Sequence, residues 1–165
     1  MITIKTNNLL KILLSIMLIS GFVACDEGGD PDPGATATVE LAGDWFVQTF
    51  YQGDLVLDYV QIASFNTAAN TSTEMWLDDN GHIWPFKVKV PIDLNSKSFS
   101  GASLTDEYNG ITVNITNGIV VKDGATTTGG NTSDSISFDI EFSDDPGFTY
   151  HIEGYKRTGF LEDEH

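Results

Sequence analysis

Histidine and carboxylate side chains are the groups in this 165-residue sequence that could do acid/base chemistry near neutral pH. The histidines are His82, His151 and His165. Three carboxylates could form an acid/base set with His82, namely Asp44, Glu74 and Asp78. Their positions along the chain do not show that they converge in space. Each histidine could equally be an ordinary surface residue with no catalytic role, so we leave the catalytic residues unassigned.

Nucleophile and metal motifs add little to this set. The sequence has no Gly-x-Ser-x-Gly elbow, and its single cysteine, Cys25, has another explanation given below. The run Asp78-Asp79-Asn80-Gly81 offers oxygen ligands and a glycine, but it lacks the spacing and the distal Glu of a calcium loop. We therefore expect neither a metal nor another cofactor. Hydrolysis of an unknown substrate stays open as an alternative function.

Cys25 follows a segment typical of a secretory signal. Lys5 and Lys11 precede an apolar run over residues 12–24, which is too short to span a bilayer comfortably. The sequence Phe22-Val23-Ala24-Cys25 resembles the lipobox of bacterial lipoproteins, with Phe22 where Leu is usual. We predict a signal peptide over residues 1–24 and acylation of Cys25, which would anchor the protein in the outer membrane, facing the periplasm or the cell surface. A buried free cysteine after an uncleaved helix is the alternative.

The composition after Cys25 predicts a tether and then one domain. Residues 25–38 are rich in Asp, Gly and Pro, which favours a flexible acidic tether, and residues 39–165 have the length of one domain. The chain has 24 acidic and 8 basic residues, for a formal net charge of -16. Such a charge repels nucleic acid, so we expect no nucleic-acid partner and a domain that is monomeric.

Alternating apolar and polar residues predict antiparallel strands joined by tight turns. The segments outside the central hairpin are Asp44–Tyr51, Asp58–Asn66, Lys97–Ala102, Gly110–Thr116, Ile119–Lys122, Asp134–Ser143 and Phe148–Arg157. The sequence Asn117-Gly118 between two of them predicts a second type I′ hairpin. With the central hairpin there are about eight or nine strands, which favours an all-β, up-and-down barrel. A strongly curved sandwich is the alternative.

The central hairpin covers residues 74–90 and is centred on Asn80-Gly81, the strongest short signal for a type I′ turn. A two-residue turn places Leu77 opposite Trp84 and Met75 opposite Phe86, which gives the ribbon one apolar face. We expect these four side chains to line a cavity that binds a lipid or another small hydrophobic ligand. In the alternative, side chains fill the interior and the domain is an interaction or accessory module of the cell envelope.

Two short motifs favour closure of the barrel. Gly43-Asp44-Trp45 in the first strand and Arg157 in the last resemble the closure of lipocalins. There the Trp of the first strand packs at the base of the barrel under an Arg from the final strand. The resemblance implies a cation-π contact between Trp45 and Arg157.

The whole domain resembles a family of bacterial lipoproteins, the lipid-binding putative hydrolases. The segments that carry the resemblance are Gly43-Asp44-Trp45, Asn66-Thr67-Ala68-Ala69-Asn70, Met75-Trp76-Leu77-Asp78-Asp79-Asn80-Gly81, Phe86-Lys87-Val88-Lys89-Val90, Gly124-Ala125-Thr126-Thr127 and Gly154-Tyr155-Lys156-Arg157-Thr158-Gly159-Phe160. They extend over nearly all of residues 39–164. The resemblance implies a lipocalin-like barrel and a lipid ligand, and it brings no catalytic residues with it.

Overall fold

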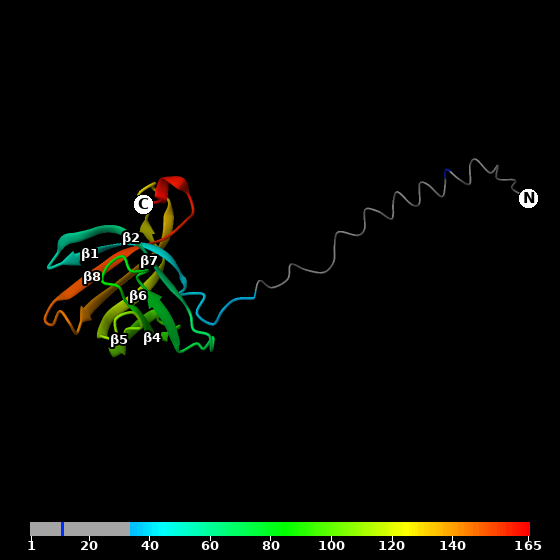
Figure 1. Cartoon of the computed structure of the whole chain (residues 1–165). Helices are drawn as coiled ribbons and strands as arrows, with labels where there is room; N and C mark the ends of the chain where they lie inside the picture. The colour runs from blue at the N-terminus through cyan, green and yellow to red at the C-terminus, as the bar shows by residue number, and fades with distance from the viewer. Residues whose placement is uncertain (1–10, 12–33) are drawn as a thin grey trace, which may run out of the picture. The chain divides into compact units, whose positions relative to one another are not determined.

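A computed structural model describes residue 11 and residues 34–165 of the chain. Eight antiparallel strands follow one another around a closed barrel, in which β8 pairs with β1 (Figure 1). The strands are β1 Gly43–Tyr51, β2 Asp54–Asn66, β3 Glu74–Asp78, β4 Lys87–Asp93, β5 Ser98–Thr105, β6 Thr112–Thr126, β7 Thr132–Phe142 and β8 Thr149–Lys156, followed by the 3₁₀ helix η1 Leu161–Asp163. The predicted all-β, lipocalin-like barrel is confirmed. In the described part of the chain, no helix is long and apolar enough to cross a bilayer.

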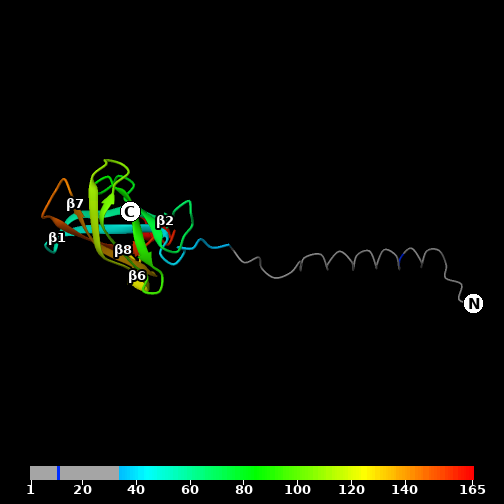
Figure 2. The same ribbon diagram turned by 90° about the horizontal axis from the view of Figure 1, so that it is seen from below.

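The up-and-down order of the strands gives the barrel two different ends. The loops β1–β2, β3–β4, β5–β6 and β7–β8 lie at one end, which we call the mouth. The other three loops lie at the opposite end, which we call the closed end, together with the segments that enter β1 and leave β8. Figure 1 shows the red C-terminal segment beside the yellow β6–β7 loop, and Figure 2 shows the barrel from below. Side chains at alternate strand positions meet in one buried core cluster.

The predicted turn at Asn80-Gly81 forms, but the predicted strand register is wrong. Both residues have positive φ, 53° and 77°, and the His82 N–H donates to the Asp79 carbonyl at 3.0 Å. The strands resume pairing only at Lys87, so Leu77 lies opposite Val88 and not Trp84. The register has shifted by an even number of residues, which keeps the same face of each strand inward.

The predicted hairpin at Asn117-Gly118 does not form. Strand β6 continues through both residues, and its pairing with β7 skips one position between Thr116 and Ile119. Asn117 has φ 54°, and a Cβ on Gly118 would lie 2.3 Å from the carbonyl oxygen of Phe99 on β5. The left-handed conformation that Asn117 has in this bulge is also the one that a type I′ turn needs at its first central residue, so an Asn-Gly dipeptide alone does not distinguish them.

The segment that enters β1 belongs to the barrel domain. The compact unit begins at Ala35, and Thr38 and Leu41 are fully buried. The Ala37 N–H donates to the side-chain oxygen of Asn70 at 2.9 Å. The last residues of the predicted tether are thus folded. Cys25, the tether up to residue 33 and the predicted signal peptide except Lys11 lie outside the described residues.

Strands β4 and β5 are joined through two residue pairs, Ile92 with Phe99 and Asp93 with Ser98. The Ile92 N–H donates to Thr73 on the side of β3. Since successive residues of a strand direct their N–H groups to opposite neighbours, Pro91 faces β5, where proline has no N–H to donate. This junction is therefore the shortest ladder of the described barrel.

Candidate functional site

The closed end is filled around Trp45. Its side chain is fully buried, and its Nε1–H donates to Ser64 Oγ at 2.8 Å. The Ser64 hydroxyl donates in turn to the Leu41 carbonyl at 2.6 Å, which ties the segment before β1 to the barrel. Each polar atom in this chain of contacts has a partner, as a buried position requires.

The cation over Trp45 is Lys156, not Arg157. Strand pairing places Lys156 directly opposite Trp45, and its Nζ lies 5.7 Å from the ring centroid. Arg157 is the next residue, so its side chain faces the other side of the strand and forms an ion pair with Glu164 at 2.7 Å. A Cβ on Gly43 would lie 2.8 Å from Lys156 Cε, so the glycine leaves room for the lysine stem.

The C-terminal segment covers this end through Asp163. Its buried carboxylate accepts hydrogen bonds from Gly129 N at 2.9 Å, Asn131 Nδ2 at 3.0 Å and Thr158 Oγ1 at 2.6 Å. Burial raises the pKa of Asp163, but hydrogen bonds from groups including Thr127 and Thr158 outweigh it and hold the pKa below its ordinary value. The side chain of His165 completes the cover, stacked on Tyr59 with 4.2 Å between ring centroids.

Three of the four predicted ligand-binding side chains lie in the core. Met75, Leu77 and Phe86 are fully buried in the same cluster of packed side chains. Trp84 is different, because 37% of it is exposed and it lies at the mouth. Of the four, Trp84 borders a pocket that opens at the surface.

This mouth pocket has a volume of about 210 Å³. Its walls come from five separate segments of the chain and are mostly apolar or aromatic. They are Thr49, Val56, Leu57, Ile83, Trp84, Phe142 and Tyr150. Trp84 stacks on Phe142 with 5.4 Å between ring centroids and a 21° angle, and its Nε1–H donates to Asp144 at 3.3 Å. An apolar pocket with a few polar atoms at its edge is the usual form of a site for a small hydrophobic ligand.

A buried carboxylate holds the loop that carries Trp84. Asp79 is fully buried, and its Oδ1 accepts the backbone N–H groups of Gly81 at 2.8 Å and Phe86 at 2.9 Å. Its Oδ2 accepts those of Ile83 at 2.9 Å and Trp84 at 3.0 Å. One side chain thus satisfies four N–H groups of the loop. An Asp before Asn-Gly is the only signal in the sequence for this role.

Two further buried carboxylates fix the neighbouring loops. Asp78 accepts the Tyr108 hydroxyl at 2.8 Å and pairs with Lys87 Nζ at 3.1 Å. This hydrogen bond, burial and the nearby carboxylate charges raise the pKa of Tyr108 to about 12. Asp106 accepts the backbone N–H groups of Lys87 at 2.8 Å and Asn109 at 2.7 Å. Both carboxylates therefore hold the loops at the mouth in place.

The suggested acid/base set does not assemble. The ring Nδ1 of His82 lies 2.7 Å from the Gln61 carbonyl, and Asp78 is occupied by Tyr108 and Lys87. Asp44 and Glu74 lie at the starts of their strands, at the closed end. In the part of the chain that the structure describes, no hydrogen bond or ion pair joins two of the four, and no cluster of His, Cys, Asp and Glu is arranged to hold a metal.

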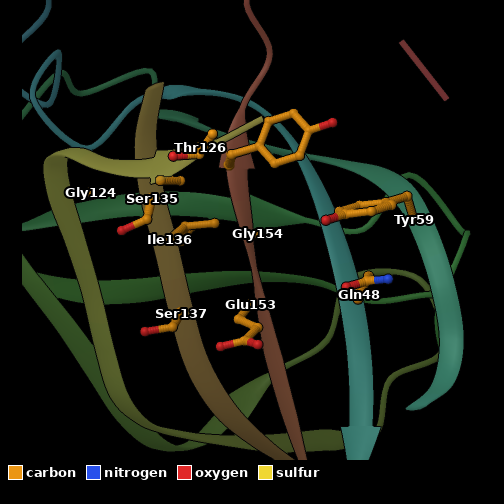
Figure 3. Close-up of a pocket in the computed structure, with 11 residues that line it drawn as sticks. Gln48, Tyr59, Gly124, Thr126, Ser135, Ile136, Ser137, Glu153 and Gly154 are labelled. Carbon is orange, nitrogen blue, oxygen red and sulfur yellow. The ribbon is translucent and has the colours of Figure 1, made fainter. Parts of the chain in front are cut away.

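A second pocket lies on the outer face of the barrel and has a volume of about 290 Å³ (Figure 3). Figure 3 shows Ser137 on β7 and Glu153 on β8, with Gln48 on β1 and Tyr59 on β2 beyond them. Two histidines adjoin this pocket. His165 Nε2 lies 2.6 Å from the hydroxyl of Tyr155, which lines the pocket. His151 Nδ1 lies 2.7 Å from Asp139, and its Nε2 lies 3.4 Å from Glu153. Both ring nitrogens face carboxylates, so His151 does not pair with a hydroxyl nucleophile as an ester hydrolase requires.

Comparison with known proteins shows to which family this chain belongs. The model of the family described as lipid-binding putative hydrolase matches residues 30–161, which covers the whole barrel. A search of curated proteins gives no match. The family description agrees with a closed lipocalin-like barrel that carries an apolar pocket at its mouth. The chain belongs to the lipid-binding putative hydrolase family.

Proposed function

We propose that this protein is a lipoprotein of the cell envelope whose barrel binds a small hydrophobic ligand in the mouth pocket. The observation that carries the proposal is the apolar pocket in which Trp84 stacks on Phe142, at the open end of a barrel of a lipid-binding family. The buried interior side chains pack against one another, so the ligand binds at the end of the barrel and not in its centre.

The size of the pocket limits the ligand. An engineered apolar cavity of about 150 Å³ holds one benzene molecule. A pocket of about 210 Å³ therefore accepts one ring with a short substituent, or the end of an acyl chain, and not a whole membrane lipid. A longer chain would continue outward along the exposed side chains of Val56 and Trp84.

Membrane attachment is the second part of the proposal. The lipobox-like sequence before Cys25 supports acylation of that cysteine and anchoring in the outer membrane. Labelled palmitate should appear in the wild-type protein and be absent from Cys25→Ala. Label that persists in this variant would contradict the anchor and leave the ligand site unaffected.

The ligand site is tested with residues 35–165. These residues form one compact unit whose strands all pair within it, so they can be purified without the lipid anchor. Addition of 1-octanol should change Trp84 fluorescence, and Trp84→Phe should abolish that change. Trp76→Phe is the matched control, because Trp76 lies on the outer face of β3, near Lys87 and Lys89, and not in the pocket.

The same preparation distinguishes the alternatives. Turnover of an ester from a substrate panel would support a hydrolase, for which His165 Nε2 is in contact with the hydroxyls of Thr128 at 3.3 Å and Tyr155 at 2.6 Å. Absence of binding to any alcohol, fatty acid or ester would favour an envelope interaction module. In either case native mass spectrometry before and after incubation with mixed lipids gives the bound mass directly.

A further inference from the structure

The hydroxyl of Thr49 is buried in the described structure without a hydrogen-bond partner. Only 3% of the residue is exposed, and its Oγ1 has no donor or acceptor within reach. An unpaired buried hydroxyl destabilises a fold, because it loses its bonds to water. Two other threonines, Thr38 and Thr67, share this condition at the closed end, but Thr49 lines the mouth pocket.

The surroundings of Thr49 do not offer it a partner. Its neighbours on the adjacent strands are Leu57 and Ile152, which are apolar. The other polar side-chain atoms of the pocket wall are already bonded, since Trp84 Nε1 donates to Asp144 at 3.3 Å and the Tyr150 hydroxyl donates to Asp145 at 2.8 Å. Within the described residues, Thr49 Oγ1 is therefore the side-chain polar atom of the pocket wall that has no hydrogen-bond partner.

Charge around the pocket decides which ligand group suits this hydroxyl. The carboxylates of Asp144 and Asp145 lie at the rim, and the described pocket wall has no cationic side chain. A carboxylate or phosphate would lose its hydration there without a counter-ion and would be repelled by both aspartates. A neutral hydroxyl or carbonyl avoids both penalties.

We propose that the mouth pocket takes a neutral apolar molecule whose hydroxyl or carbonyl oxygen hydrogen-bonds Thr49 Oγ1. This inference rests on the proposed function and names its ligand class, an alcohol, ester or ketone in place of a fatty-acid anion. The polar atom points inward to Thr49, and the apolar part lies against Val56 and Trp84.

The test uses three probes of matched size, toluene, benzyl alcohol and benzoate, each titrated into residues 35–165 and followed by backbone amide NMR. The measured quantity is the ratio of the affinities for benzyl alcohol and toluene, which cancels general effects on the pocket. Thr49→Val keeps the shape and removes the hydroxyl, so this ratio should fall roughly 2- to 10-fold. Thr49→Ser keeps the hydroxyl and should preserve the ratio. Benzoate should bind more weakly than both neutral probes.

Each outcome separates the two proposals. An unchanged ratio in Thr49→Val, with toluene still bound at the mouth, would overturn the role of Thr49 and leave the proposed function intact. No shift of mouth amides with any probe would overturn both. Thr49→Val should fold at least as well as wild type, because it removes an unpaired polar atom. A marked loss of stability in that variant would show that the hydroxyl has an internal partner, which also overturns the inference.

Discussion

Trp45 and Trp84 lie at opposite ends of one barrel and have opposite surroundings. Trp45 is fully buried, with its N–H bonded to Ser64 and Lys156 Nζ over its ring. Trp84 is 37% exposed, stacks on a single aromatic ring and bonds to Asp144 on a loop. At the closed end, both the N–H and the ring of Trp45 have partners. At the mouth, part of the Trp84 ring remains exposed to solvent. The comparison shows how one residue type closes one end of the fold and forms a site at the other.

The two ends of the barrel should differ most in the free energy of unfolding that is lost when Trp45 or Trp84 is replaced by alanine. Trp45→Ala leaves a large cavity and removes the donor to Ser64 Oγ, and we expect it to lower the free energy of unfolding by about 3–5 kcal/mol. Trp84→Ala removes one partly exposed ring and should lower it by about 1–2 kcal/mol. Urea unfolding followed by circular dichroism measures both. Equal losses would mean that the mouth is as tightly packed as the closed end.

The next effect concerns the loop that carries Trp84. Asp79→Ala leaves four backbone N–H groups without their acceptor, and we expect a loss of about 2–4 kcal/mol. Trp84 emission should shift to longer wavelength as the loop opens. Asp144→Ala, which removes a single long hydrogen bond at the rim, is the matched control and should cost less than about 1 kcal/mol. A stable Asp79→Ala variant with unchanged Trp84 emission would show that the loop does not depend on this carboxylate.

A smaller effect should distinguish the two cations at the end of β8. Lys156→Met keeps the apolar stem and removes the charge over Trp45, with an expected loss of about 0.5–2 kcal/mol. Arg157→Ala breaks an exposed ion pair with Glu164 and should lower the free energy of unfolding by less than Lys156→Met does. The same urea measurement compares them. A larger loss for Arg157→Ala would restore the lipocalin-like role that the sequence suggests for this residue.

The smallest effect is a local loosening of the closed end in acid. The pKa of Asp163 is lowered in the folded protein, so its contribution is complete above the ordinary Asp value of about 4 and is lost as the pH falls through the lower folded pKa. The Gly129 amide, which donates to Asp163, should show this titration in an NMR pH series. In Asp163→Asn the Gly129 shift should become independent of pH over this range. A Gly129 shift that follows the ordinary Asp pKa would contradict the cover formed by Asp163.

The strand pattern predicts the barrel because alternation assigns each residue to a face. The error in the central hairpin moves the register by an even number of residues, so Met75, Leu77 and Phe86 still face inward. Asn80-Gly81 has positive φ at both residues and forms a turn, whereas in Asn117-Gly118 only the asparagine has positive φ and the strand continues through a bulge. Pairing with distant strands decides between these outcomes, and local sequence does not contain that information.

The site is less predictable from the sequence than the fold. Trp84 is expected at a ligand site, and it borders the mouth pocket, but the walls of that pocket come from residues as distant as Thr49 and Tyr150. The role of Asp79 depends on a loop folding back around its carboxylate, and that of Thr49 depends on the apolar residues that surround it. Such roles arise from three-dimensional proximity. Arg157 fails for a simpler reason, since a shift of one residue along a strand reverses the face of the side chain.

The short ladder between β4 and β5 also determines how this barrel opens. With Pro91 unable to donate an N–H and two residue pairs holding the strands, this junction separates with the least loss of backbone hydrogen bonds. The amide hydrogen of Ser98, which faces β4, should therefore exchange with solvent faster than those at the centre of β7. Transient separation along this seam would expose core side chains such as Phe99 to solvent through the wall of the barrel before any other junction of the described strands separates.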